Sequence, residues 1–287
     1  MIKRMLGIGV TLLVASAVPL AHQDTLPFSA QDPSHVLDVR RIIESSVAAT
    51  QRHWRTRLHY TYLERDASLR RDLNGLVRSE EVEISRTILV NDVQFEQLVQ
   101  RNGQPPSALE VWRQNEALNK LKRETPTQRT ERVRRWEEET SSLVREVPEA
   151  FDFQLVGQEI INGRAAYALH ATPHAGYQAR GRYGKLFSKV EGKLWIDRED
   201  LVWIKVDGQV IQPFSIGLFL VRLLRGSQIT VEQTRVDDRI WLPMRVEVRA
   251  AAKILLFKDL VIERVLTYSD YRRAGEDPPA TREAAVP

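Results

Sequence analysis

The stretch that decides the fold is Phe151–Thr172, which reads FDFQLVGQEIINGRAAYALHAT. Apolar and polar residues alternate along both halves, as they do in strands with one face in a core and one in solvent. Between the halves lies Asn162-Gly163, a dipeptide typical of the tight turn of a β-hairpin. The stretch therefore predicts two antiparallel strands, Phe151–Ile161 and Ala165–Thr172.

The same alternation continues to Arg272 and is broken by turn residues at short intervals. It predicts further strands over Lys185–Asp197, Leu201–Ile211, Ser227–Val236, Ile240–Ala250 and Lys253–Tyr271, the last with room for two strands.

Three strands are also predicted upstream of this run, over Leu58–Tyr62, Leu76–Asn91 and Val93–Gln100. Between the first two, the charged segment Glu64–Asp72 and the following Asn74-Gly75 are interpreted as a turn. Such a meander favours antiparallel pairing.

Helical spacing occurs in two places. Over Ser34–Trp54 the apolar residues fall on one face, so this helix is expected to cover an apolar surface. Ser107–Val147 is dense in charged residues and contains two helix-start patterns. It predicts two helices, about 108–124 and 126–146, which lie on the surface and depend on the sheet for stability.

These elements describe an α+β fold that is mainly antiparallel β. We expect a single domain over residues 34–272, with a helical insertion at 107–147. The last residues, 273–287, are rich in Pro, Ala and charged side chains and are expected to form a disordered tail.

The N-terminus has the layout of a cleaved signal peptide, assigned to Met1–Ala21. Lys3 and Arg4 precede the apolar core Met5–Val18, which is shorter than the ~20 residues that a membrane-spanning helix needs. An uncleaved anchor is the alternative. The chain has no cysteine, which excludes a disulfide framework and a lipid-modified N-terminal cysteine. A soluble protein of a bacterial periplasm is therefore expected.

The charge of the chain argues against nucleic acid as a partner. Cleavage lowers the formal net charge from +4 to +2, because Lys3 and Arg4 leave and no acidic residue does. The remaining basic residues are interleaved with acidic ones rather than clustered.

Signals for catalysis are weak. No G-x-S-x-G, H-E-x-x-H or phosphate-loop motif occurs, and a cysteine nucleophile is excluded. His170 and His174 are four apart in an extended segment, which separates them by ~13 Å and argues against a shared metal ion. Asp197, Glu199 and Asp200 are interpreted as a solvated hairpin turn. We therefore expect a binding protein rather than an enzyme, with no catalytic residue, metal or cofactor.

Phe214–Leu224, FSIGLFLVRLL, interrupts the alternation. Either both of its faces are buried, or it is a short helix against the open mouth of the sheet, and its length does not decide between them. It is interpreted as ordinary core or as a rim that meets acyl chains or the membrane surface. The tryptophans of the neighbouring strands are open to two similar interpretations, core packing and the lining of an apolar cavity. The candidate ligand-binding residues are Trp195, Trp203, Ile216, Leu218, Phe219, Leu220 and Trp241.

The order of elements resembles the LolA/LolB-like superfamily, which contains periplasmic carriers of outer-membrane lipoproteins. The resemblance spans roughly Val36–Tyr271 and rests on element order and strand texture. Besides the first helix, the matching stretches are RLHYTYL, EVEISRTILVND, VQFEQLV, FDFQLVGQEIINGRAAYALHATP, GKLWIDREDLVWIKVDGQV and WLPMRVEV.

The resemblance implies a half-open curled β-sheet, or partial barrel, with the N-terminal helix and the helical insertion as a lid over lipid chains. It also implies an arginine early in the sheet that holds the lid closed, and Arg86 lies in a comparable strand. The chain departs from the family in its longer, more charged insertion and in Phe214–Leu224, which has no counterpart.

Two functions remain. The first is a periplasmic carrier or sensor that binds lipoprotein acyl chains, other lipids or other amphiphilic ligands in an apolar hollow. The alternative is a protein-interaction module of the same fold, which binds a periplasmic or outer-membrane protein through the helices of Ser107–Val147.

Overall fold

The computed structural model describes residues 38–91, 93–180, 184–216, 221–237, 240–254 and 258–274. The predicted signal peptide Met1–Ala21, the helix start at Ser34 and most of the predicted tail lie outside these described residues. Among the described residues, no helix is both long enough and apolar enough to cross a membrane.

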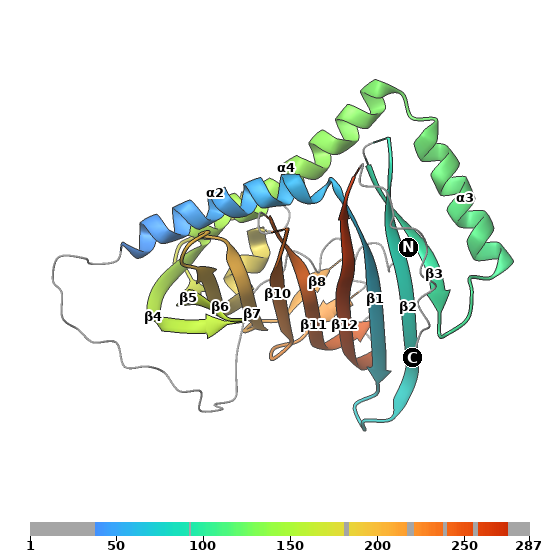
Figure 1. Ribbon diagram of the computed structural model, residues 1–287. Helices are drawn as coiled ribbons and strands as arrows, with labels where there is room; N and C mark the ends of the chain where they lie inside the picture. The colour runs from blue at the N-terminus through green and yellow to red at the C-terminus, as the bar shows by residue number, and fades with distance from the viewer. Residues whose placement is uncertain are drawn as a thin grey trace.

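Over the residues that the structure describes, twelve strands form one antiparallel sheet (Figure 1). Their order along the main path is β3-β2-β1-β12-β11-β10-β7-β6-β5-β4, and β8 and β9 extend from β11. The strands are β1 (Tyr60–Arg71), β2 (Val77–Val90), β3 (Val93–Arg101), β4 (Phe151–Ile161), β5 (Arg164–Pro173), β6 (Val190–Asp197), β7 (Trp203–Val210), β8 (Phe214–Ile216), β9 (Val221–Leu223), β10 (Gln228–Val236), β11 (Ile240–Ile254) and β12 (Lys258–Arg273).

The sheet is curled and open. Its path ends at β3 and β4, and within the described residues these two edge strands do not pair with each other. Pairing of β1 with β12 joins the N-terminal meander to the last strand of the chain, so all strands belong to a single sheet. The expected half-open, mainly antiparallel architecture is confirmed.

Two long helices cross one face of the sheet, α2 (Val39–Arg57) and α4 (Pro126–Ala150), and they contact each other and β4 (Figure 1). A third helix, α3 (Ala108–Lys122), stands beside β2 and β3, and a short 3₁₀ helix, η1 (Gly184–Lys189), packs against α4.

The two helices predicted between residues 107 and 147 are confirmed. Each begins with a capping box, Ser107 with Glu110 and Thr125 with Gln128, in which side chains satisfy the first free N–H groups of the helix. α3, which is described along its whole length, buries none of its residues. It is therefore held mainly by its ends and by contacts with the edge of the sheet.

Three local predictions are wrong. The strand predicted over Lys185–Asp197 begins only at Val190, because Gly184–Lys189 forms the 3₁₀ helix η1. Glu64–Asp72 is not a turn, because β1 continues to Arg71 between two partner strands that pair with it along its length. The turn is confined to residues 72–76, where Gly75 has a φ of 82° and the Asp72 carboxylate accepts from two backbone N–H groups. Phe214–Leu224 is neither one buried strand nor a helix over its described residues, since Phe214–Ile216 and Val221–Leu223 pair as short strands.

Candidate functional site

One row of directly paired residues crosses the sheet from edge to edge and defines what we call its inner face. Residues directly opposite each other in neighbouring strands point to the same side of a sheet. From β4 to β3 the row consists of Leu155, Leu169, Leu194, Val206, Val231, Val246, Leu266, Asp66, Glu83 and Arg101. The row is aliphatic as far as β12 and charged on β1, β2 and β3.

The aliphatic end of the inner face is covered by helix α2. Ile42, Ile43 and Val47 of α2 belong to one buried cluster with row members that include Leu169 and Leu194. Burial of each aliphatic side chain of this size contributes roughly 1.5–3 kcal/mol. Packing on the inner face is therefore what holds α2 in place.

The buried side of α2 also carries hydroxyl groups. Ser46 is fully buried, and its Oγ accepts a hydrogen bond of 2.8 Å from Nε1 of Trp203. Thr50 is also fully buried, yet its Oγ1 has no hydrogen-bond partner among the described residues. A buried polar group without a partner costs about 1–3 kcal/mol. α2 therefore covers the sheet less favourably than an entirely apolar helix would.

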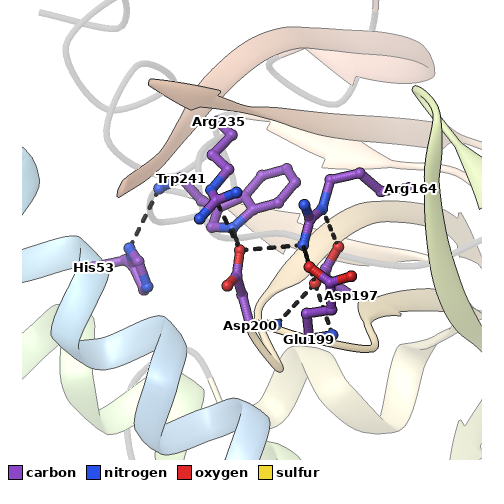
Figure 2. Close-up of polar contacts among 7 residues, drawn as sticks. All are labelled: His53, Arg164, Asp197, Glu199, Asp200, Arg235 and Trp241. Carbon is purple, nitrogen blue, oxygen red and sulfur yellow. Dashed lines mark hydrogen bonds and ion pairs between the residues drawn. The ribbon is translucent and has the colours of Figure 1, made fainter. Parts of the chain in front are cut away.

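The C-terminal half of α2 contacts a group of mostly polar residues, which we call the junction cluster (Figure 2). Its members are His53, Arg164, Asp197, Glu199, Asp200, Arg235 and Trp241. His53 of α2 accepts a hydrogen bond from the backbone N–H of Trp241 through Nδ1, at 3.2 Å. Nε1 of the same tryptophan donates to Oδ2 of Asp200 at 2.8 Å. The ring of Trp241 lies 5.5 Å from the guanidinium carbon of Arg164, a cation–π distance.

The centre of the junction cluster is Asp197, whose side chain is 1% exposed. Arg164 donates to both of its oxygens, at 2.5 and 2.8 Å, and Oδ1 also accepts from the backbone N–H groups of Glu199 and Asp200. Burial by itself raises the pKa of Asp197, but these hydrogen bonds outweigh it and hold the pKa below its usual value. The prediction of a solvated turn is therefore wrong for Asp197, whereas Glu199 is 80% exposed.

The charged end of the inner face holds a half-buried ion pair and a carboxyl group with a raised pKa. Arg264 donates two hydrogen bonds to Asp66, at 2.8 and 2.6 Å. Two positions earlier on β1, Glu64 lies on the same face, directly opposite Tyr268 of β12. Burial, followed by the charges of Glu96 and Asp66, raises the pKa of Glu64 to about 7. Glu64 therefore changes its charge near neutral pH.

Apolar side chains continue between the helix-covered end and the charged end. Ile229, Val231 and Val248 are half-buried and pack against the cluster that contains Val246 and Leu266. This part of the inner face thus combines partly accessible aliphatic side chains with ionisable groups one strand away.

The three predicted tryptophans lie in two buried clusters, Trp203 in one and Trp195 and Trp241 in the other. Trp203 lies on the inner face in the cluster beneath α2, and Trp241 lies in the junction cluster. Trp195 follows the inner-face residue Leu194 and so points to the opposite side of the sheet. There its Nε1 donates to Glu159 at 2.7 Å, and Lys193 and Lys205 lie over its ring.

The remaining predicted site residues belong to the interrupted segment. Ile216 ends β8, and its side chain lies outside what the structure describes, as do Leu218, Phe219 and Leu220 altogether. Arg86 is exposed and points away from the inner face, because its neighbours Ser85 and Thr87 are the inward residues of β2.

Sequence reasoning missed the charged end of the inner face. The available signal was Tyr62-x-Glu64-x-Asp66, whose alternate positions share one face of a strand. The density of charge in this segment suggested a turn instead. The pairing of β1 with β12, which supplies Arg264 and Tyr268, has no local signal in the sequence.

No family model matches the chain, and no curated protein does. Solved structures of similar fold include a putative outer membrane lipoprotein-sorting protein domain from Vibrio parahaemolyticus, with 12% identity over 82% of this chain and 95% of that chain and a TM-score of 0.35. A DUF1329 family protein from Desulfovibrio piger has 9% identity, the same two coverages and a TM-score of 0.31. A LolA superfamily protein from Nitrosomonas europaea has 12% identity, covers 83% of this chain and 94% of that chain, and has a TM-score of 0.26.

Proposed function

We propose that this protein is a periplasmic carrier or sensor that binds acyl chains of lipoproteins or other amphiphilic ligands on the inner face of its sheet. Helix α2 acts as the lid and moves aside to expose the aliphatic end of that face. The observation that carries the proposal is the cover of an aliphatic row by a helix that buries the unpartnered hydroxyl of Thr50.

A helix with such a defect in its contact surface is suited to reversible displacement. Opening returns the Thr50 hydroxyl and the Ser46–Trp203 pair to water, which offsets part of the loss of apolar burial. An acyl chain that takes the place of α2 restores that burial, at about 0.8 kcal/mol for each CH₂ group removed from water. Replacement of the helix by a ligand therefore costs less free energy than removal of the helix alone.

The half-buried residues Ile229, Val231 and Val248 extend the acyl-binding surface beyond the helix. Of the tryptophans predicted to bind ligand, Trp203 fits this proposal, because it lies on the inner face under α2. Ligand contact by Ile216, Leu218, Phe219 and Leu220 stays a prediction.

The test is native mass spectrometry of protein purified from the periplasm without detergent, followed by titration with decyl maltoside. We expect bound acyl-chain species in the wild type and their loss in Val231→Asp, which places a charge on the inner face. Val265→Asp is the matched control, because Val265 is also half-buried but neighbours Leu266 and faces the opposite side. Absence of amphiphile from the wild type, or equal retention by both variants, would contradict the proposal.

One observation favours the alternative function as a protein-interaction module. α3 exposes Leu109, Val111 and Trp112, with exposed fractions of 54%, 43% and 61%. Large exposed apolar side chains on one short helix are typical of a contact surface. If α3 binds a partner protein, Trp112→Ala abolishes cross-linking to that partner in the periplasm and leaves decyl maltoside binding unchanged. Retention of the cross-link in this variant would rule out α3 as the contact.

A further inference from the structure

Arg57, the last residue of α2, reaches the charged end of the inner face. Its Nη2 lies 3.4 Å from the hydroxyl of Tyr62, and its guanidinium carbon lies 5.8 Å from the centre of the Tyr62 ring. The ring centres of Tyr268 and Tyr271 are 5.7 and 5.5 Å from that of Tyr62. The guanidinium thus lies over the ring of Tyr62, which in turn contacts the other two tyrosine rings, and Arg57 as a whole residue is half-buried.

The position of Arg57 is built by the fold. Gln94 of β3 donates hydrogen bonds from Nε2 to the backbone oxygens of Arg57 and Tyr60, at 3.0 and 2.9 Å. These bonds secure the chain reversal between α2 and β1. Because both anchors lie in the backbone, Arg57 is presented to Tyr62 independently of any bond made by its own side chain.

The arginine lacks an acidic partner. A guanidinium has five N–H donors and no acceptor, and partly buried charges are normally paired. Within the part of the chain that the structure describes, no carboxylate lies within 4.0 Å of Arg57. Two other arginines of the charged end do have carboxylate partners: Arg264 pairs with Asp66, and Arg101 pairs with Glu83.

The adjacent hydroxyl is a second free donor. Tyr271 donates its hydroxyl proton to the backbone oxygen of Pro243 at 2.5 Å, and Tyr268 lies directly opposite Glu64 in the sheet. The Tyr62 oxygen accepts from Arg57, and its proton has no acceptor among the described residues. Arg57 and Tyr62 therefore present hydrogen-bond donors side by side, with no acceptor between them.

We propose that Arg57 and Tyr62 bind the anionic group of the ligand, a carboxylate, phosphate or sulfonate oxyanion. The proposal rests on the proposed function for the position of the tail: Tyr62 packs in one cluster with Val246 and Leu266, so a chain attached to the anion lies directly on the aliphatic row. The ligand class is thus an anionic amphiphile, with its charge at Arg57 and its tail toward β10 and β7.

Three acids lie near this site, and none of them prevents anion binding. Glu96 shares the inner face through the pairs Tyr62–Thr87 and Thr87–Glu96, but it is exposed to solvent, which screens its charge. Asp66 is neutralised by its two hydrogen bonds from Arg264. Glu64 lies directly opposite Tyr268 in the sheet, and its pKa of about 7 leaves it largely protonated in weakly acidic solution. A test at pH 6 therefore minimises repulsion.

The experiment is isothermal titration calorimetry of the full mature protein at pH 6 with three probes: decanesulfonate, decyl maltoside and inorganic sulfate. The variants are Arg57→Gln and Tyr62→Phe. The matched control is Arg52→Gln, an exposed arginine on the same helix with no ion pair among the described residues. Near-UV circular dichroism establishes that each variant keeps its tertiary packing.

We expect Arg57→Gln to weaken decanesulfonate binding about tenfold or more, because hydrogen bonds to charged groups are the strong ones. Tyr62→Phe weakens it about threefold. Decyl maltoside binding stays unchanged in both variants, and Arg52→Gln behaves as the wild type does. Decanesulfonate binding by Arg57→Gln or by Tyr62→Phe that equals the control overturns the proposal.

The sulfate probe separates this inference from the proposed function. If the wild type binds sulfate but neither decyl compound, the acyl-binding function is contradicted. Loss of sulfate binding in Arg57→Gln would then still support an oxyanion site, one that binds a free anion. If the wild type binds decyl maltoside and decanesulfonate equally, the acyl-binding function stands and the anion site is overturned.

Discussion

Leu266 of β12 pairs directly with Asp66 of β1, and at this pair the inner face changes from aliphatic to charged. On one side the row continues through Val246 and Val231, and on the other through Glu83 and Arg101. A surface with this division suits a ligand that has an apolar chain and a charged end. The lid, its attachment and the two ends of the face can each be tested by a single substitution.

Thr50→Val tests the lid directly. The substitution replaces the unpartnered hydroxyl of Thr50 with a methyl group of similar size, so the closed state gains about 1–2 kcal/mol of unfolding free energy. Because opening then costs more, binding of decyl maltoside weakens about fivefold. Urea unfolding and calorimetry measure the two effects. Ser45→Ala on the exposed side of α2 is the control, and a stabilised Thr50→Val protein with unaltered affinity would mean that α2 does not move.

His53→Asn tests the attachment of α2 to the junction cluster. Nδ1 of His53 accepts from the Trp241 N–H, which requires an unprotonated Nδ1, and burial lowers the pKa of His53 from its usual 6.5 despite the attraction of Asp200. The contribution of this bond to stability is therefore present above pH 6.5 and is lost as the pH falls through the lower folded-state pKa. The asparagine side chain of the variant offers an amide oxygen that does not titrate.

We expect hydrogen exchange in the C-terminal half of α2 to accelerate between about pH 7.5 and 5 in the wild type, after correction for intrinsic rates, and to change much less in His53→Asn. The same acceleration in both proteins would show that another group controls the helix. Arg52 and Asp200 are the other charged groups that act on His53.

Glu64→Gln tests the charged end. The pKa of Glu64 is about 7 in the folded protein against an ordinary value of 4.5, so the ionised carboxylate disfavours folding. This penalty is absent below pH 4.5, grows as the pH rises to 7 and is complete above it. The glutamine variant should match the wild type at about pH 4 and be more stable at about pH 8 by about 2 kcal/mol. Urea unfolding at both pH values measures this, and equal stability at the higher pH would contradict the assignment.

Asp197→Asn tests the centre of the junction cluster. Asp197 is buried and accepts two of the hydrogen bonds of Arg164, so removal of its charge leaves the guanidinium without its principal partner. Loss of one member of a buried pair costs about 3 kcal/mol, which thermal or urea unfolding resolves easily. Glu199→Gln is the matched control, since Glu199 also contacts Arg164 but is exposed, and its loss should cost less than about 1 kcal/mol, as expected for surface pairs.

The strands were predictable because alternation and turn residues are local. Asn162-Gly163 forms its hairpin as expected, and the capping boxes at Ser107 and Thr125 start the predicted helices. The charge density of β1 led to the wrong prediction of a turn, because the contact that neutralises its charge is not local. Asp66 is neutralised by Arg264, which lies 198 residues further along the chain, and no local sequence pattern indicates that contact.

The faces of the tryptophans show a second limit of sequence patterns. Trp195 pairs with Lys205, so regular pairing would place Trp203 on the same face as Trp195. A register shift between Trp195 and Ile196 pairs Ile196 with Trp203 instead and turns Trp203 to the inner face. One extra residue in a strand decides which tryptophan lies under the lid.

The pairing of β1 with β12 also affects the order in which the strands of the sheet can pair during folding. The hairpin of β1 and β2 has a local partner as soon as it emerges, but its second neighbour is the last strand of the sheet. Contacts of such long sequence separation form late, because a large loop must close first. The aliphatic end of the inner face can therefore assemble before the charged end. A chain cut before Lys258 would lack Arg264, Leu266 and Tyr268, and its β1 would have no strand to join it to β11.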